Sequence, residues 1–108
     1  MKTRKMRLLR IKSSHKTEKK YDAVFLKPDG KEKVVPFGQK GYNDFLIYNK
    51  KEGEKTAKVH RQRYLKRHSG MGEHWNKPDT PGALSRWVLW NKPTLKSSLA
   101  DFKRRFKL

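Results

Sequence analysis

Helical spacing of hydrophobic and polar positions is clearest in the last third of the chain, where it predicts two helices joined by a corner. Asp79 or Thr80 can cap the first free amides, and Pro81 suits the first helical position. Pro93 disfavours helical geometry in the residue before it and so ends the segment. The sequence therefore predicts a first helix over about residues 81–91.

This first helix is expected to be largely buried. At about 100° per residue, most of its hydrophobic side chains fall within an arc of about 160°. They are those of Ala83, Leu84, Trp87, Val88 and Trp90. Ser85, Arg86 and Leu89 lie on the other side.

A second helix is predicted over about residues 94–106, with Thr94 as its cap. Its hydrophobic residues follow the spacing i, i+4, i+7, i+11 from Leu95 and stay within about 60°. An adjoining stripe carries Lys96, Lys103 and Lys107, with Arg104 beside it. The two helices are expected to supply most of the core, through Leu84, Trp87, Val88, Trp90, Leu95, Leu99, Phe102 and Phe106.

The first half of the chain has the shorter periodicity of strands. Residues 21–26 and 32–37 are β-branched or aromatic runs, and the Pro-Asp-Gly between them is a turn sequence, so a β-hairpin is predicted. Residues 3–12 mix hydrophobic and basic positions with one shift of phase, which predicts an edge strand with a bulge. Residues 44–48 are interpreted as a short further strand.

Between these strands, Gly38 and Gly41 predict a tight turn with positive φ. A nucleotide-binding loop is not favoured, because the further glycines or the Gly-Lys-Ser/Thr ending of such loops are absent. In the connector over residues 69–79, Trp75 is interpreted as a lid on the core, with an exposed stacking platform as the alternative.

A helix is also predicted over about residues 53–68. One narrow face carries Ala57, His60, Tyr64 and His68, flanked by Arg61 and Arg67, and the reverse carries Lys55, Arg63 and Lys66. Two interpretations remain open. The helix is either a solvated one that packs Tyr64 on the core, or one laid on phosphates.

Taken together, the patterns predict an α+β fold in one small basic domain over residues 1–108. Residues 1–20 form a basic arm or edge strand, 21–50 a β region with an antiparallel hairpin or small sheet, and 53–106 a helical region with about three helices. Hydrophobic residues make up only 33% of the chain, so the core is modest.

Charge is the strongest guide to function. The net charge is +19, and residues 1–40, 41–70 and 71–108 are each net positive. Such a surface favours nucleic-acid phosphate as a partner, then an acidic protein lattice, then an anionic membrane. The residues predicted to bind a polyanion are Arg61, Arg63, Lys66, Arg67, Lys96, Lys103, Arg104 and Lys107.

Catalytic chemistry is not indicated. There is no cysteine, the four histidines lack metal-ligand spacing, and the few carboxylates are scattered, with Asp101 placed to form a surface pair with Arg105. We therefore expect no enzyme activity, no metal, no cofactor and no small-molecule substrate. No apolar run approaches the roughly 18 residues of a membrane span, and no signal sequence is evident, so a soluble, non-secreted protein is expected.

Three blocks of sequence carry a resemblance. They are Phe37-Gly38-x-x-Gly41-Tyr42-x-Asp44-Phe45, Arg63-Tyr64-Leu65-x-Arg67-His68, and the long run from Trp75-x-x-Pro78 through Gly82-Ala83-Leu84-Ser85-Arg86-Trp87-Val88-Leu89-Trp90-Asn91-Lys92-Pro93-Thr94-Leu95. Over about residues 36–106 the chain resembles a family of small basic proteins of unknown function from large double-stranded DNA viruses of algae and other protists (nucleocytoplasmic large DNA viruses). Residues 1–35 lie outside this resemblance, and residues 49–56 look like a longer linker than the family pattern has.

The resemblance implies a virion setting and no catalytic residues. Two functions remain open. One is a minor capsid or internal virion component, wedged between larger capsid subunits, whose cations meet acidic surfaces or packaged double-stranded DNA. The other is a free, sequence-independent nucleic-acid-binding or genome-condensing protein, and the resemblance favours the first.

Overall fold

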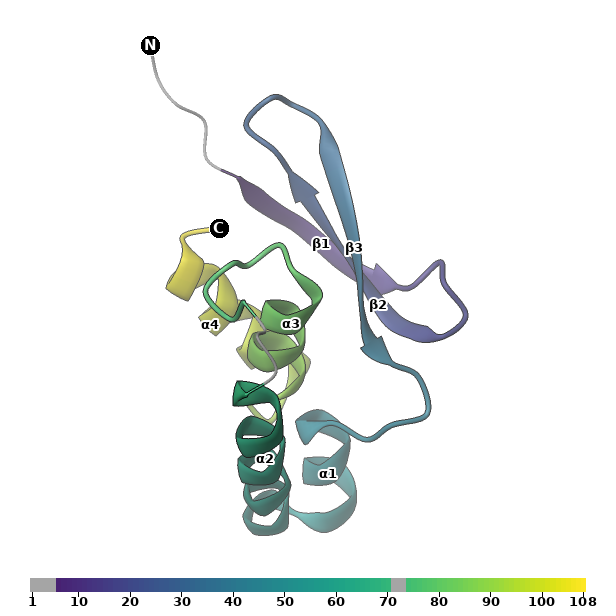
Figure 1. Cartoon of the computed structure of the whole chain (residues 1–108), viewed down its shortest axis with the longest axis vertical. Helices are drawn as coiled ribbons and strands as arrows, with labels where there is room; N and C mark the ends of the chain where they lie inside the picture. The colour runs from purple at the N-terminus through teal and green to yellow at the C-terminus, as the bar shows by residue number, and fades with distance from the viewer. Residues whose placement is uncertain (1–5, 71–73) are drawn as a thin grey trace.

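The computed structural model describes residues 6–70 and 74–108 and has strands followed by helices (Figure 1). The strands are β1 (Arg7–Ser13), β2 (Lys19–Leu26) and β3 (Glu32–Gln39). The helical elements are α1 (Phe45–Glu52), α2 (Glu54–Ser69), α3 (Pro81–Leu84), the π-helical turn η1 (Ser85–Leu89) and α4 (Leu95–Phe106). This is the predicted α+β order, with a small antiparallel sheet before a helical region.

The sheet has the order β1-β2-β3, and both pairs are antiparallel. The predicted hairpin joins β2 to β3: the Asp29 carboxylate accepts from the Lys31 amide at 2.9 Å, and Gly30 has a φ of 87°. β1 is the predicted edge strand, and its register with β2 shifts between Leu8 and Arg10, which is the predicted bulge. The part of that prediction on residues 3–5 lies outside the described residues.

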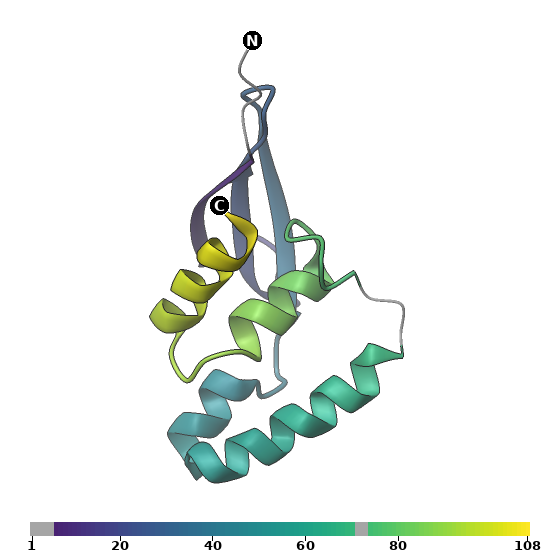
Figure 2. The same cartoon turned by 90° about the vertical axis from the view of Figure 1, so that its left-hand side faces the viewer.

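Helices cover one face and one end of the sheet. Figure 2 shows α3 and α4 crossing one face, whereas α1 and α2 lie beyond the end at which β3 stops. Alternate side chains of β2 and β3, such as Phe25 and Phe37, point into this helical layer and are fully buried. The β3–α1 loop and α2 therefore lie near the same end of the sheet.

The predicted first helix of the last third is interrupted by the π-helical turn. Thr80 caps its start, accepting from the Ala83 amide at 3.3 Å, and the Trp90 amide then donates to the Ser85 carbonyl at 3.0 Å, an i→i+5 bond. Each residue of this wider turn rotates the chain by less than an α-helix does, so Leu89 turns inward and is only 2% exposed. The placement of Leu89 on the outer side was wrong for this reason.

Gly38 shows why the inward Leu89 needs a glycine opposite it. Gly38 has the predicted positive φ, 80°, and a Cβ there would lie 2.9 Å from the Leu89 Cδ1 atom. Any side chain at this position would therefore clash as well as strain the backbone.

The core is broader than the sequence predicted. Leu84, Val88, Trp90 and Phe102 are buried, and Trp87, Leu95, Leu99 and Phe106 are partly buried against them. However, the sheet contributes Phe25 and Phe37, and α1 contributes Phe45, all essentially inaccessible to solvent. The expectation that the two C-terminal helices supply most of the core was therefore too narrow.

The segment after the sheet is helical rather than a further strand. Asp44 accepts from the Ile47 amide at 3.0 Å and begins α1, and Gly53, with a φ of 87°, separates α1 from α2. Both the strand predicted at residues 44–48 and the linker at residues 49–56 were wrong, because the Asp44 cap outweighs the β propensity of the residues that follow. The helix predicted at residues 53–68 is present as α2, and Thr94 caps α4 as predicted.

Candidate nucleic-acid interface

Most of the predicted polyanion-binding residues are free to meet a ligand. Those that are exposed, with side chains that form no ion pair or hydrogen bond with any described residue, are Arg63, Lys66, Arg67, Lys96, Lys103 and Lys107. The lysines at 96, 103 and 107 belong to α4 or its C-terminal end, and the others to α2. The structure thus places them on two separate elements.

Arg61 and Arg104 differ from the rest. Arg61 is half-buried, donates to the Asn91 carbonyl oxygen at 2.7 Å, and lies over the Phe45 ring at 4.6 Å from its centroid. It therefore ties α2 to the segment after η1, and its assignment to phosphate binding stays a prediction. Arg104 pairs with Asp101 at 3.1 Å, although its side chain remains 76% exposed.

Arg63 and Arg67 line a groove at the end of the sheet, of about 810 Å³. It lies between α2 on one side and the ends of β2 and β3, with the β3–α1 loop, on the other. We call it the α2 groove. The groove adds cations that the sequence had not singled out, Lys19 and Lys20 of β2.

Aromatic rings form one wall of the α2 groove. Tyr48 stacks on His60 with centroids 3.7 Å apart, and Tyr64 stacks on Trp90 at 4.5 Å and on His68 at 4.3 Å. Tyr48 and Trp90 are 6.1 Å apart, so the rings form a continuous column from α1 across the end of η1 to α2. Such packing makes this wall rigid.

The acidic group in the α2 groove is already neutralised. Asp44 is buried, forms an ion pair with Lys20 at 2.7 Å, and caps α1 with its other carboxylate oxygen. Lys19, Arg63 and Arg67 have no such partner among the described residues. The groove therefore presents net positive charge.

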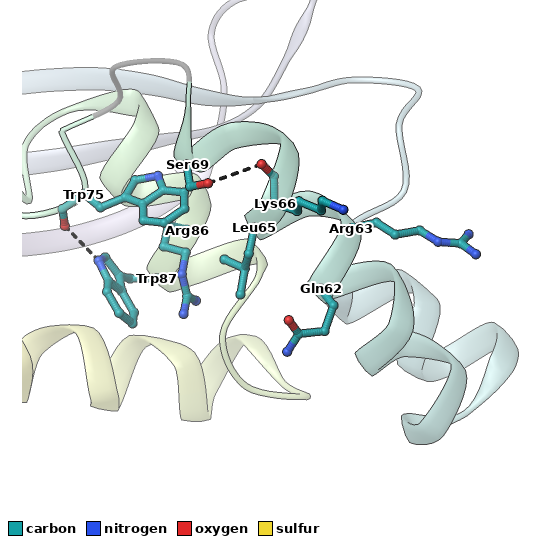
Figure 3. A pocket seen from close by; sticks show the side chains of 8 residues that line it. All are labelled: Gln62, Arg63, Leu65, Lys66, Ser69, Trp75, Arg86 and Trp87. Atoms are coloured by element: carbon teal, nitrogen blue, oxygen red, sulfur yellow. Dashed lines mark hydrogen bonds between the residues drawn. The ribbon is translucent and has the colours of Figure 1, made fainter.

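A second, shallower groove lies on the other side of α2 (Figure 3). There Trp87 donates its indole N–H to the Trp75 carbonyl at 2.8 Å, and Trp75 packs against the core as a lid, the first of its two interpretations. Arg63 and Lys66 extend away from both indoles. We therefore assign this surface to packing.

Arg86, which the sequence did not single out, is central to that packing. Its guanidinium lies 4.1 Å from the Trp87 centroid and donates to the Trp90 carbonyl at 2.9 Å. Burial, together with the nearby charges of Arg61 and Arg105, lowers its pKa. Stacking on an indole offsets part of the cost of burying this charge.

The structure also reveals two buried carboxylates. Asp101 is only 7% exposed and accepts from the Asn91 side chain at 2.7 Å as well as from Arg104 and Arg105. The predicted pair with Arg105 is therefore present, but the prediction that it lies at the surface was wrong, because the carboxylate is buried. Asp22, in the middle of the sheet, is fully buried. The burial of these carboxylates was not predictable from spacing, because Ser14 and His15 at Asp22, and Asn91 at Asp101, come from other segments.

Asp22 clamps the loop between β1 and β2. Ser14 donates its hydroxyl to one carboxylate oxygen at 2.6 Å, and His15 contacts the other through its ring and through its amide at 3.1 Å. Burial would raise the pKa of Asp22, but these hydrogen bonds outweigh it and lower the pKa to about 2. Because Ser14 and His15 both bind the carboxylate and not each other, this is not the arrangement of a serine nucleophile and its base.

We expect Asp22→Asn to reduce stability by about 1 to 2 kcal/mol at neutral pH, because the amide cannot accept all of these hydrogen bonds. A carboxylate whose pKa is lowered in the folded state stabilises the fold at pH values above its pKa in the unfolded chain. This contribution is lost as the pH falls towards the folded-state pKa of about 2. Urea titrations at a series of pH values should show a smaller acid-dependent loss in the variant than in the wild type. Parallel curves for the two proteins below pH about 4 would contradict this role.

Neither a metal centre nor a membrane span is found in the part of the chain that the structure describes. Within residues 6–70 and 74–108, no three His, Asp or Glu side chains gather as metal ligands. No helix there is both long and apolar enough to cross a bilayer. Comparison with protein-family models, curated proteins and solved structures finds no match. A function must therefore be inferred from the chain's own residues.

Proposed function

We propose that the protein is a non-enzymatic component of a large DNA virus particle that binds nucleic-acid phosphate without reading base sequence. The observation that carries the proposal is the set of exposed cations on α2 and α4 that have no acidic partner among the described residues. Flexible cationic side chains bind phosphates by displacing counterions, which gives affinity without sequence information.

A long polyanion fits this distribution better than a small anion does. The cations lie on separate elements of a molecule that measures 49 × 27 × 26 Å, so one small anion cannot neutralise them together. A nucleic acid can contact several of them at once. The aromatic side chains beside Arg63 and Arg67 also favour nucleic acid over an acidic protein surface.

The virion setting is supported by the resemblance of residues 36–106 to basic proteins of large DNA viruses. The same resemblance favours a second candidate, in which the protein is a minor capsid component and its cations meet acidic capsid subunits. A map of the native particle would separate the two by showing what contacts Lys96, Lys103 and Lys107. Proteomics of purified particles would overturn both if the protein were absent.

Salt titration tests the binding itself. If about six phosphates are neutralised, affinity for DNA of any sequence should fall about 10³-fold between 50 and 200 mM salt. Fluorescence anisotropy with two labelled oligonucleotides of unrelated sequence would measure this, and the two should bind alike. A protein that retains no DNA at 50 mM salt would rule out the proposal.

Variants of α4 sharpen the same test. Lys103→Ala should leave folding intact and reduce the slope of log K against log salt by about 1. Lys33 offers a matched control, because it is exposed but already paired with Asp79 at 2.8 Å. Lys33→Ala removes the same formal charge and should change the slope less. Equal effects of the two substitutions would mean that only net charge matters, not the unpaired cations.

A further inference from the structure

We propose that the α2 groove holds a single-stranded segment of nucleic acid, with its phosphates on Lys19, Arg63 and Arg67 and one base stacked on Tyr42. The inference rests on the proposed binding of nucleic acid and specifies the strand form and the site. It is carried by the coincidence of an exposed aromatic ring and unpaired cations in one groove.

Tyr42 is unlike the other aromatic residues of the chain. All Phe, Tyr and Trp residues lie in the described part, and among them only Tyr42, at 68%, is exposed. The ring adds nothing to the core, yet it lines the groove. A nucleic-acid base is a flat partner of matching size, and stacking on such rings is tolerant of sequence.

The loop that carries Tyr42 is anchored on both sides. Before it, the Tyr42 amide donates to the Gln39 carbonyl at 3.4 Å, and Gly41 takes a φ of 90°. After it, Asp44 is fixed by Lys20 and by the start of α1. The ring is therefore presented from a held backbone, which lowers the entropy lost when a base stacks on it.

The cations opposite Tyr42 follow a line. Arg63 and Arg67 are one turn apart on α2, so they share a face at a rise of about 6 Å. Lys19 comes from β2 on the other side of the groove. A single phosphodiester backbone running along α2 can meet both arginines while a base reaches across to the β3–α1 loop.

A duplex does not fit these features equally well. Its bases are already paired and stacked, so Tyr42 would have no exposed base face to contact. The groove, at about 810 Å³, is also within the size range of small-ligand clefts and can admit a short strand but not the body of a duplex. A duplex would meet only the outer cations, such as those of α4.

The test compares a labelled oligothymidylate with a duplex of the same length by fluorescence anisotropy. Tyr42→Ala should weaken single-strand binding about 5- to 100-fold and leave duplex binding within about twofold. Tyr42→Phe keeps the ring and should retain most of the single-strand affinity. Lys103→Ala, on α4 and outside the groove, serves as the charge control and should weaken duplex binding more than single-strand binding. Unchanged far-UV circular dichroism and melting would show that the variants fold.

The outcomes separate this inference from the proposed function. If Tyr42→Ala leaves single-strand affinity unchanged, or weakens both forms equally, the inference is overturned while binding of nucleic acid stands. If polyglutamate binds as tightly as oligothymidylate, and Tyr42→Ala weakens the binding of neither, the groove is a site for acidic peptide and the inference fails. If neither nucleic acid binds at 50 mM salt, the proposed function itself has failed.

Discussion

Replacing Trp87 by alanine should destabilise the protein by about 3 to 5 kcal/mol. Two guanidiniums contact the ring, with Arg86 at 4.1 Å and Arg105 at 3.8 Å from its centroid. It also packs edge-on against Phe106, at 6.4 Å, and donates to the Trp75 carbonyl. Alanine would leave a cavity, remove the hydrogen bond to the Trp75 carbonyl and take away the ring that both guanidiniums contact.

Thermal and urea unfolding followed by circular dichroism would measure this loss. In a domain of this size it corresponds to a fall in Tm of at least about 10 °C. Trp87→Phe retains a ring for the two guanidiniums to contact and should recover more than half of the stability, and Lys103→Ala should melt as the wild type does. A Trp87→Ala protein that melts within a few degrees of the wild type would refute the placement of Trp87 in the core.

The fold was predictable wherever local chemistry decides it. The Pro-Asp-Gly turn, the Thr80 and Thr94 caps and the phase shift in β1 each act within a few residues, so the sequence showed them. The π-helical turn was not predictable, because Leu89, which it turns inward, packs against Gly38 of a strand that is distant in the sequence. The same limit applies to the shared core of sheet and helices.

The candidate site was predictable only in part. Periodicity found the cations of α2 and α4, because each set follows the repeat of its own helix. It could not find the α2 groove, since Lys19 and Tyr42 are brought to Arg63 by tertiary packing alone. Arg61 shows the opposite case, a residue that periodicity grouped with the exposed arginines of α2. Its side chain instead turns inward and donates to the Asn91 carbonyl.

Asp101 links three segments of the helical layer. It accepts from the Asn91 side chain of the corner and from Arg104 and Arg105 of α4, while the Asn91 carbonyl accepts from Arg61 of α2. The hydrogen bond from Asn91, and then the two arginines, outweigh burial and lower the pKa of this carboxyl. Arg105, held in this way, covers the Trp87 ring.

Asp101→Ala should therefore reduce stability by about 3 kcal/mol, measured by urea unfolding at neutral pH, because it removes charged hydrogen bonds and leaves the buried Asn91 amide short of an acceptor. A surface ion pair in a helix would contribute only about 0.3 to 0.5 kcal/mol. Glu54→Ala provides that comparison, since Glu54 and Lys58 form an exposed pair at 3.4 Å. The contribution of Asp101 to stability should be complete at pH values above the ordinary carboxyl pKa. It should be lost as the pH falls through the lowered pKa of the folded state. If Asp101→Ala costs no more than Glu54→Ala, the corner, α2 and α4 are held together by apolar packing alone.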